Sequence, residues 1–227
     1  MKLPQALVFD LDGTLVDSDR LYSSALRTIG IDPEGNEFLS ARERAKTKTV
    51  AGHVSARNRL LYFKEILLAH GAYSHSELVR WMEEYEKALC DEIGREWQRL
   101  QRPALFRKIR ARFPIALLTN ETTRMQTLKC ATLDPDGQLF PIVITSEEIG
   151  VEKPDPKGFR LVASTLGVTP EDCWMVGDSL SMDIEPAHRL GMTTVWTQEF
   201  AQQKLEVSPF SSYCIENLES LISMLQL

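Results

Sequence analysis

Five short apolar runs, each continuous rather than alternating with polar residues, constrain the fold of this chain more than any other feature. They cover residues 6–9, 115–118, 142–144, 173–176 and 193–196. A strand that is apolar at every position needs helices on both of its faces, and the segments between these runs suit crossover helices. The pattern therefore predicts an α/β fold built on a doubly wound parallel sheet.

One connection is too long to be a crossover. The chain leaves the first apolar run near Asp12 and reaches the second at residue 115, and the residues between are helical in character. We expect helices over residues 19–29, over 37–70 with a break near Gly52, and over 76–97 with Ser76 as the N-cap. We therefore predict a small α-helical cap domain (residues 17–98) inserted into a core domain (residues 1–16 and 99–227).

The composition is that of a globular protein, with 43% hydrophobic residues and only 12 Gly and 11 Pro in 227. The net charge of −6 argues against nucleic-acid partners and anionic membrane surfaces, since both bind basic surface. No apolar run exceeds four residues, and the N-terminus lacks the apolar stretch of a signal peptide. We expect no membrane partner and a cytoplasmic location; the oligomeric state is left open.

Polar residues follow three of the apolar runs directly. The side chains that stand at or just beyond these ends are Asp10, Asp12, Thr119, Asn120, Asp178 and, five residues after the last, Asp183. In open parallel sheets, ligands bind beyond the carboxyl ends of the strands. We therefore expect these side chains to meet in one crevice.

Carboxylates that converge on one crevice repel one another unless a cation lies among them. Carboxylate oxygens are ligands for hard divalent cations. The sequence therefore predicts a metal site, with Mg²⁺ as the expected ion and Asp10, Asp12, Asp178 and Asp183 as the candidate residues. Gly177 is expected to keep space open beside Asp178.

The spacing of the first two acids suits covalent chemistry. Asp10 and Asp12 are two residues apart in an extended segment, which points both side chains to the same side. One carboxylate can then attack a substrate while its neighbour transfers a proton.

A phosphate-binding role is predicted for the second strand end and for one loop. Thr119 and Asn120 precede a helix that we expect to begin near Thr122, and their hydroxyl and backbone N–H groups suit an anion. Lys153, which Pro154 holds in a loop, adds a positive charge.

These residues form four motifs that resemble those of the haloacid dehalogenase-like (HAD) superfamily. The motifs are DxDGT[LV] at residues 10–15, a threonine closing a hydrophobic strand at Thr119, a lysine ahead of a helix at Lys153, and GDSxxxD at residues 177–183. All four occur in the order of the family. They anchor the core, whereas the cap resembles the family only in its position and helical character.

The resemblance implies phosphoryl transfer to and from an aspartate. Asp10 would be the nucleophile, and Asp12 would protonate the leaving oxygen and then activate the water that breaks the aspartyl-phosphate. Thr119 and Lys153 would hold the transferring group. The substrate would be a small phosphorylated metabolite.

The resemblance also implies a ligand set for Mg²⁺. Asp10, Asp178 and the backbone carbonyl of Asp12 would bind the ion, and Asp183 would bind it or orient the other ligands. Dehalogenases of the superfamily have no aspartate at the position of Asp12, which argues against dehalogenation.

Two alternatives to a phosphatase stay open. A phosphomutase resembling β-phosphoglucomutase would use the same core and differ in whether water reaches the intermediate. A binding module on the same fold would be expected to lack one of the key acids, and Asp10, Asp12, Lys153 and Asp178 are all present.

The cap carries a local excess of positive charge. Seven basic residues and one acid lie between positions 42 and 64, in a chain whose net charge is −6. Either this is a solvated helical face, or part of it faces the crevice and binds a remote anionic group of the substrate. For the second interpretation the expected residues are Arg57 and Arg59, just ahead of an apolar stretch that anchors their helix.

Overall fold

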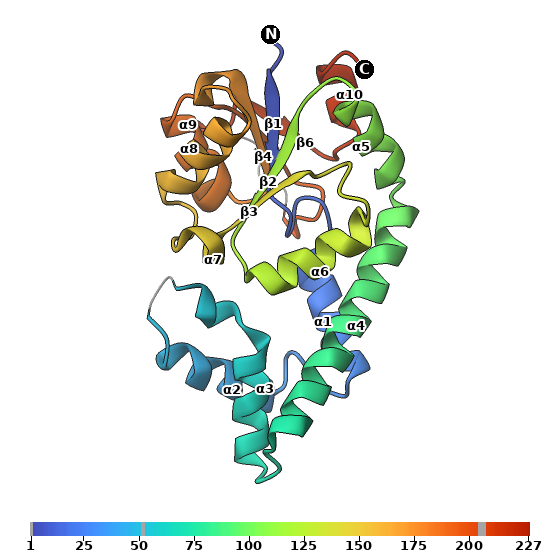
Figure 1. Ribbon diagram of the computed structural model, residues 1–227, viewed down its shortest axis with the longest axis vertical. Coiled ribbons are helices and arrows are strands. Elements are labelled where there is room, and N and C mark those ends of the chain that lie inside the picture. Colours follow the sequence, from blue (N-terminus) through green and yellow to red (C-terminus); the bar gives the residue numbers. More distant parts are fainter. Residues whose placement is uncertain (1, 51–52, 204–207) are drawn as a thin grey trace.

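The computed structural model describes residues 2–50, 53–203 and 208–227 (Figure 1). Its strands are β1 (Ala6–Phe9), β2 (Ile115–Thr119), β3 (Ile142–Thr145), β4 (Cys173–Gly177), β5 (Thr193–Thr197) and β6 (Tyr213–Ile215). Within the described residues they form one six-stranded sheet in the order β3-β2-β1-β4-β5-β6, with every pair parallel. The predicted doubly wound parallel sheet is confirmed. The short edge strand β6 was not predicted.

Both faces of the sheet are covered by helices because its strands are apolar on both sides. Leu7 and Phe9 belong to one buried cluster, whereas Ala6 and Val8 belong to the other. The first cluster includes side chains of α5 (Arg102–Arg110), α6 (Thr123–Leu133) and α10 (Ser220–Met224). The second includes side chains of α8 (Pro156–Thr165) and α9 (Glu185–Arg189). Alternate residues of a strand point to opposite faces, so a continuous apolar run serves both clusters.

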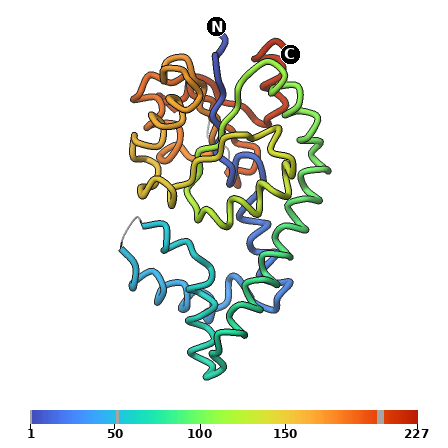
Figure 2. Tube along the Cα trace, viewed as in Figure 1, coloured from blue at the N-terminus to red at the C-terminus, as the bar shows by residue number. Residues whose placement is uncertain are grey.

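The long connection between β1 and β2 is a helical segment. It consists of α1 (Ser18–Thr28), α2 (Asn36–Thr47), the 3₁₀ turn η1 (Val54–Arg57), α3 (Arg59–Ala69) and α4 (His75–Arg99). We call this segment the inserted helices. Figures 1 and 2 show it beyond one end of the sheet, with the long helix α4 returning the chain to the sheet alongside α6. The limits of a separate cap domain at residues 17 and 98 stay a prediction.

Aromatic packing joins α4 to the sheet. Trp97, at the end of α4, stacks on Phe106 of α5 with ring centroids 5.5 Å apart. Phe106 in turn meets Phe9 of β1 edge to face at 5.2 Å. All three rings are buried, and burying a side chain of this size contributes about 2–3 kcal/mol. The last turn of α4 is therefore fixed to the core.

Two details of the expected helices differ in the structure. The N-cap of α4 is Ser74 rather than Ser76, because the Ser74 hydroxyl accepts a hydrogen bond from the Glu77 N–H at 3.1 Å. The expected long helix is interrupted between α2 and α3, and Gly52, where we expected the break, lies outside the described residues. Among the described helices, none has both the length and the apolar character needed to cross a membrane.

Candidate active site

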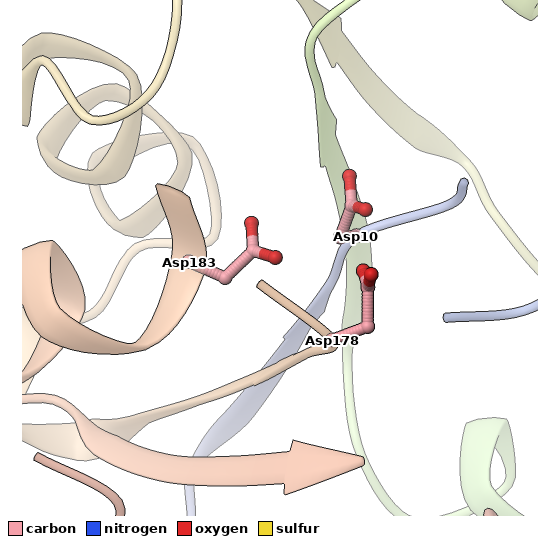
Figure 3. Close-up of side chains that lie close together, drawn as sticks. All are labelled: Asp10, Asp178 and Asp183. Atoms are coloured by element: carbon pink, nitrogen blue, oxygen red, sulfur yellow. The ribbon is translucent and has the colours of Figure 1, made fainter. Parts of the chain in front are cut away.

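Three aspartates converge beyond the carboxyl ends of β1 and β4. Asp10 directly follows β1, Asp178 directly follows β4, and Asp183 lies in the helical turn η3 (Leu180–Ile184). Each offers a carboxylate oxygen within 4.8 Å of the others, and Figure 3 shows the three groups directed into the same space. The structure thus brings together three of the four acids that we expected at the metal site. The Asp12 carboxylate lies beside another set of partners.

Two glycines permit this close approach. A Cβ on Gly177 would lie 2.5 Å from the Cβ of Asp183, so the space at Gly177 is filled by Asp183. Our expectation that Gly177 opens space beside Asp178 was wrong. Gly13 has a φ of +80°, and a Cβ there would lie 2.5 Å from a carboxylate oxygen of Asp178. Only glycine fits this turn without moving that carboxylate.

Lys153 links two of the acids. Its buried Nζ lies 2.7 Å from Asp10 Oδ1 and 2.5 Å from Asp183 Oδ1. The side chain of Asn120 holds the lysine backbone from both sides: its Oδ1 accepts from the Lys153 N–H at 2.7 Å, and its Nδ2 donates to the Lys153 carbonyl at 2.9 Å. The Asn120 side chain therefore positions Lys153, a role that we did not predict, and phosphate binding by the Asn120 backbone N–H stays a prediction.

The three carboxylates outnumber this one lysine. Burial raises the pKa of Asp10 well above its ordinary value, with Asp183 and Asp178 adding to the effect and Lys153 opposing it. Burial and the charge of Asp183 raise the pKa of Asp178 to about 6. Buried carboxylates that repel one another fit a divalent cation with oxygen ligands. The donor set of Asp10, Asp178 and Asp183 is therefore suited to such an ion.

A small cavity of about 140 Å³ adjoins this cluster. Besides the three aspartates it is lined by Asp12, Arg57, Thr119, Asn120, Lys153, Ser179 and Met182. Thr119 is the last residue of β2, and its hydroxyl accepts a hydrogen bond from Gln126 of α6 at 2.7 Å. The residues expected to carry out the chemistry thus share one cavity.

The Asp12 side chain is held by a buried lysine that we did not predict. Lys129 Nζ lies 2.6 and 2.8 Å from the two Asp12 oxygens, and Gln126 Nε2 and the Tyr22 hydroxyl donate to the same carboxylate. Burial by itself would raise the pKa of Asp12, but Lys129 and these hydrogen bonds outweigh it and lower the pKa. The contacts therefore favour the ionised form of Asp12.

A sequence signal for Lys129 was present. Met125, Lys129 and Leu133 follow one another at intervals of four on α6, and all three are buried. A lysine on the apolar stripe of a helix needs a buried counter-charge. The stripe could have indicated that Lys129 has such a partner, although the sequence does not say which one.

The two arginines that we predicted to bind substrate form ion pairs with glutamates of the core. Arg57 Nε lies 2.8 Å from Glu152 Oε1, and Arg59 Nη1 lies 2.5 Å from Glu121 Oε2. The Arg59 guanidinium also stacks over the Tyr22 ring, 4.3 Å from its centroid. Both arginines line a crevice of about 770 Å³ that also contains Asp12 and Asp178. The structure thus brings both beside the site, each already paired with a carboxylate.

Comparison with known proteins gives consistent relatives. Residues 4–191 match the family model of haloacid dehalogenase-like hydrolases. A glyceraldehyde 3-phosphate phosphatase of Methanopyrus kandleri is 31% identical over 89% of this chain and 87% of its own length. A ribulose-1,5-bisphosphate 5-phosphatase of Halopiger xanaduensis is 30% identical over 84% of this chain and 83% of its own.

Solved structures share the whole fold. YfnB of Bacillus subtilis, a HAD hydrolase whose structure was determined with magnesium bound, has a TM-score of 0.68 and 21% identity, covering 100% of both chains. A 2-haloacid dehalogenase of Pseudomonas syringae has a TM-score of 0.69 and 21% identity, covering 99% of both chains. At this identity the likeness concerns the fold, which phosphatases and dehalogenases have in common.

Proposed function

This chain belongs to the haloacid dehalogenase-like hydrolases, and from that premise we propose that it is a Mg²⁺-dependent phosphatase that hydrolyses a small phosphate monoester through a phosphorylated Asp10. The observation that carries the proposal is the surroundings of Asp10. Its buried carboxylate lies 2.7 Å from Lys153 Nζ, with Asp178 and Asp183 within 4.8 Å and Thr119 in the same cavity. A nucleophile, positive charge and a donor set for a metal are thus concentrated at one point.

In the first step, an Asp10 oxygen attacks the phosphorus atom. The bond from phosphorus to the ester oxygen breaks, its electron pair stays on that oxygen, and Asp12 donates the proton that makes the leaving alcohol. Lys153 and the Thr119 hydroxyl hold the phosphoryl oxygens. Asp12, which is ionised in the free enzyme, takes up this proton from solvent when the phosphate binds, because a nearby anion favours the protonated carboxyl group.

In the second step, Asp12 accepts a proton from water as the water attacks the phosphorus atom. The bond between phosphorus and the Asp10 oxygen breaks, and the products are inorganic phosphate and the Asp10 carboxylate. Lys129, Gln126 and Tyr22 hold Asp12 for this role.

The Mg²⁺ site in this proposal consists of Asp10, Asp178 and the backbone carbonyl of Asp12, with Asp183 as a further ligand or an orienting residue. The bound ion supplies positive charge that lets an anionic nucleophile approach an anionic phosphate. Arg57 and Arg59 would contact the remote part of a small phosphorylated metabolite. We place the enzyme in the cytoplasm.

Replacing the nucleophile tests the proposal. Asp10→Asn should abolish phosphate release in a screen of phosphorylated metabolites with Mg²⁺, because an amide cannot form the phosphorylated intermediate. Circular dichroism should show that the variant is folded. Substantial turnover by the purified variant would contradict the proposal, and phosphate transfer that requires a bisphosphate activator would favour the phosphomutase alternative.

A further inference from the structure

Helix α2 and its C-cap residue Lys48 carry basic residues on two opposite sides. Arg44 and Lys48 both form ion pairs with Glu65 of α3. Arg42 and Lys46 are displaced from them by two residues, which is about 200° around the helix axis. The spacing of four places Arg42 and Lys46 side by side on one face.

Arg42 and Lys46 line a cavity of about 610 Å³ among the inserted helices. Among the described residues, no carboxylate lies within ion-pair distance of either side chain. On the other side of the helix, in contrast, Glu65 forms ion pairs with both Arg44 and Lys48. Partial burial lowers the pKa of Lys46, and the nearby charges of Arg42, Arg57 and Arg59 lower it further, with Glu43 opposing them. These cations are thus close enough to repel one another.

The cavity shares lining residues with the candidate active site. Its lining shares Tyr22, Arg42, Arg57 and Arg59 with the 770 Å³ crevice that contains Asp12 and Asp178. Arg57 also lines the small cavity around Asp10. A molecule whose phosphate lies at Asp10 can therefore extend past Arg57 toward Arg42 and Lys46.

The charges that lack an ion-pair partner indicate what the cavity binds near Arg42 and Lys46. Glu152 and Glu121 form ion pairs with Arg57 and Arg59. Asp19, which also lines the cavity, and Glu43, next to Arg42, form no ion pair with Arg42 or Lys46 among the described residues. Phe38 and Tyr62 border the same cavity and offer apolar contact for the carbon chain of a ligand. Arg42 is exposed and Lys46 is half-buried, so both cations can meet a ligand at the cavity, where they favour an anionic group over a neutral one.

We propose that Arg42 and Lys46 form a subsite for a second anionic group, so that the substrate is a phosphate monoester that also carries a carboxylate or a second phosphate remote from the reacting one. This inference rests on the proposed phosphatase function. The inference adds to that function a class of substrate and two residues that recognise this class.

Matched substrates test the subsite. For the carboxylate arm, 3-phosphoglycerate is compared with glyceraldehyde 3-phosphate; for the phosphate arm, ribulose 1,5-bisphosphate is compared with ribulose 5-phosphate. Each pair is assayed with the wild type, with Arg42→Gln/Lys46→Gln and with Lys48→Gln. Glutamine keeps a good helix propensity, and Lys48 is the matched control on the other side of α2.

The wild type should prefer the doubly anionic member of at least one pair. The double variant should lose about 10- to 100-fold in kcat/KM for that member, the loss expected for hydrogen bonds to a charged group, and little for its partner. Lys48→Gln should behave as the wild type. The arm that responds identifies the second group as carboxylate or phosphate. Equal losses for both members of each pair, or no preference in the wild type, would overturn the inference.

Calorimetric binding of the same compounds separates this inference from the proposed function. If the protein hydrolyses none of them but binds the doubly anionic compounds through Arg42 and Lys46, the subsite stands and the phosphatase proposal fails. If hydrolysis occurs and binding by the double variant is unchanged, the phosphatase stands and the subsite is refuted.

Discussion

At the scale of single residues, Asp12 shows how its neighbours set the state of a carboxylate. Asp10 and Asp12 are two positions apart, yet their pKa values shift in opposite directions. Asp10 is buried among other acids, whereas Asp12 lies against Lys129 and two hydrogen-bond donors. The two acids are thus suited to different tasks.

Asp12→Asn is predicted to slow both formation and hydrolysis of the phosphorylated intermediate, each by about 10²- to 10⁴-fold, because the amide can neither give nor take the proton. Aryl phosphates with good leaving groups need less protonation, so their formation step should be less impaired. Rapid-quench kinetics over a series of leaving groups measures this. An equal loss of the formation step across the series would argue against Asp12 as the acid.

Lys129→Met is predicted to lower the free energy of unfolding by about 1–3 kcal/mol, because it leaves the partly buried Asp12 carboxylate without its cation. Urea unfolding of this variant, Asp12→Asn and the double variant forms a mutant cycle. The double variant should be more stable than the sum of the single effects indicates. Additive effects would show that the two side chains are not coupled.

At the scale of elements, two ion pairs connect the inserted helices to loops of the core. Arg59 stands at the first turn of α3, and its partner Glu121 lies in the loop after β2. Arg57 ends η1 and pairs with Glu152, next to Lys153. The same contacts place both arginines beside the site and attach α3 to the core.

Arg59→Met is predicted to destabilise the protein by about 1–3 kcal/mol, since Glu121 is buried and would lose its cation. Hydrogen exchange should accelerate more in α3 than in β1, because the lost contact is at the start of that helix. Arg80→Gln on α4 is the control: its ion pairs are solvent-exposed and should contribute far less. Equal effects of the two substitutions would show that the buried pair does not fasten α3.

At the scale of the whole molecule, folding brings together acids that are distant in the sequence. Asp10 and Asp178 are 168 positions apart, and the pairing of β1 with β4 places them side by side. Their repulsion opposes folding, and a bound cation relieves it. Metal binding and stability are therefore linked in this fold.

Mg²⁺ is predicted to raise the midpoint temperature of thermal unfolding. EDTA is predicted to reverse this increase and to abolish turnover. At a concentration 100 times the dissociation constant, the stabilisation should be about 2.7 kcal/mol. Asp178→Asn should weaken this response, whereas Asp172→Asn, which changes an acid at the opposite end of β4, should keep it. Full activity after exhaustive chelation would refute the metal requirement.

The sequence by itself determined five of the six described strands and their parallel arrangement, the place of the helical insertion and the residues at the strand ends. These depend on local properties: apolar runs long enough for strands, and polar residues directly after them. Asp10, Thr119 and Asp178 share one cavity because parallel strands end at the same edge, and the loop before α8 adds Lys153 to it. The order of apolar and polar residues within one segment carries this information.

Only the tertiary structure decided which charges meet. Lys129 pairs with Asp12, 117 positions away, and Asn120 holds the backbone of Lys153 rather than standing free. The segment between residues 42 and 64 reads as one basic stretch, yet Glu65, Glu121 and Glu152 compensate part of it and leave Arg42 and Lys46 facing a cavity. Which charges form pairs depends on distances across the fold, because electrostatic attraction weakens with separation and strengthens with burial. Neither the separation nor the burial of two side chains can be deduced from the order of the residues.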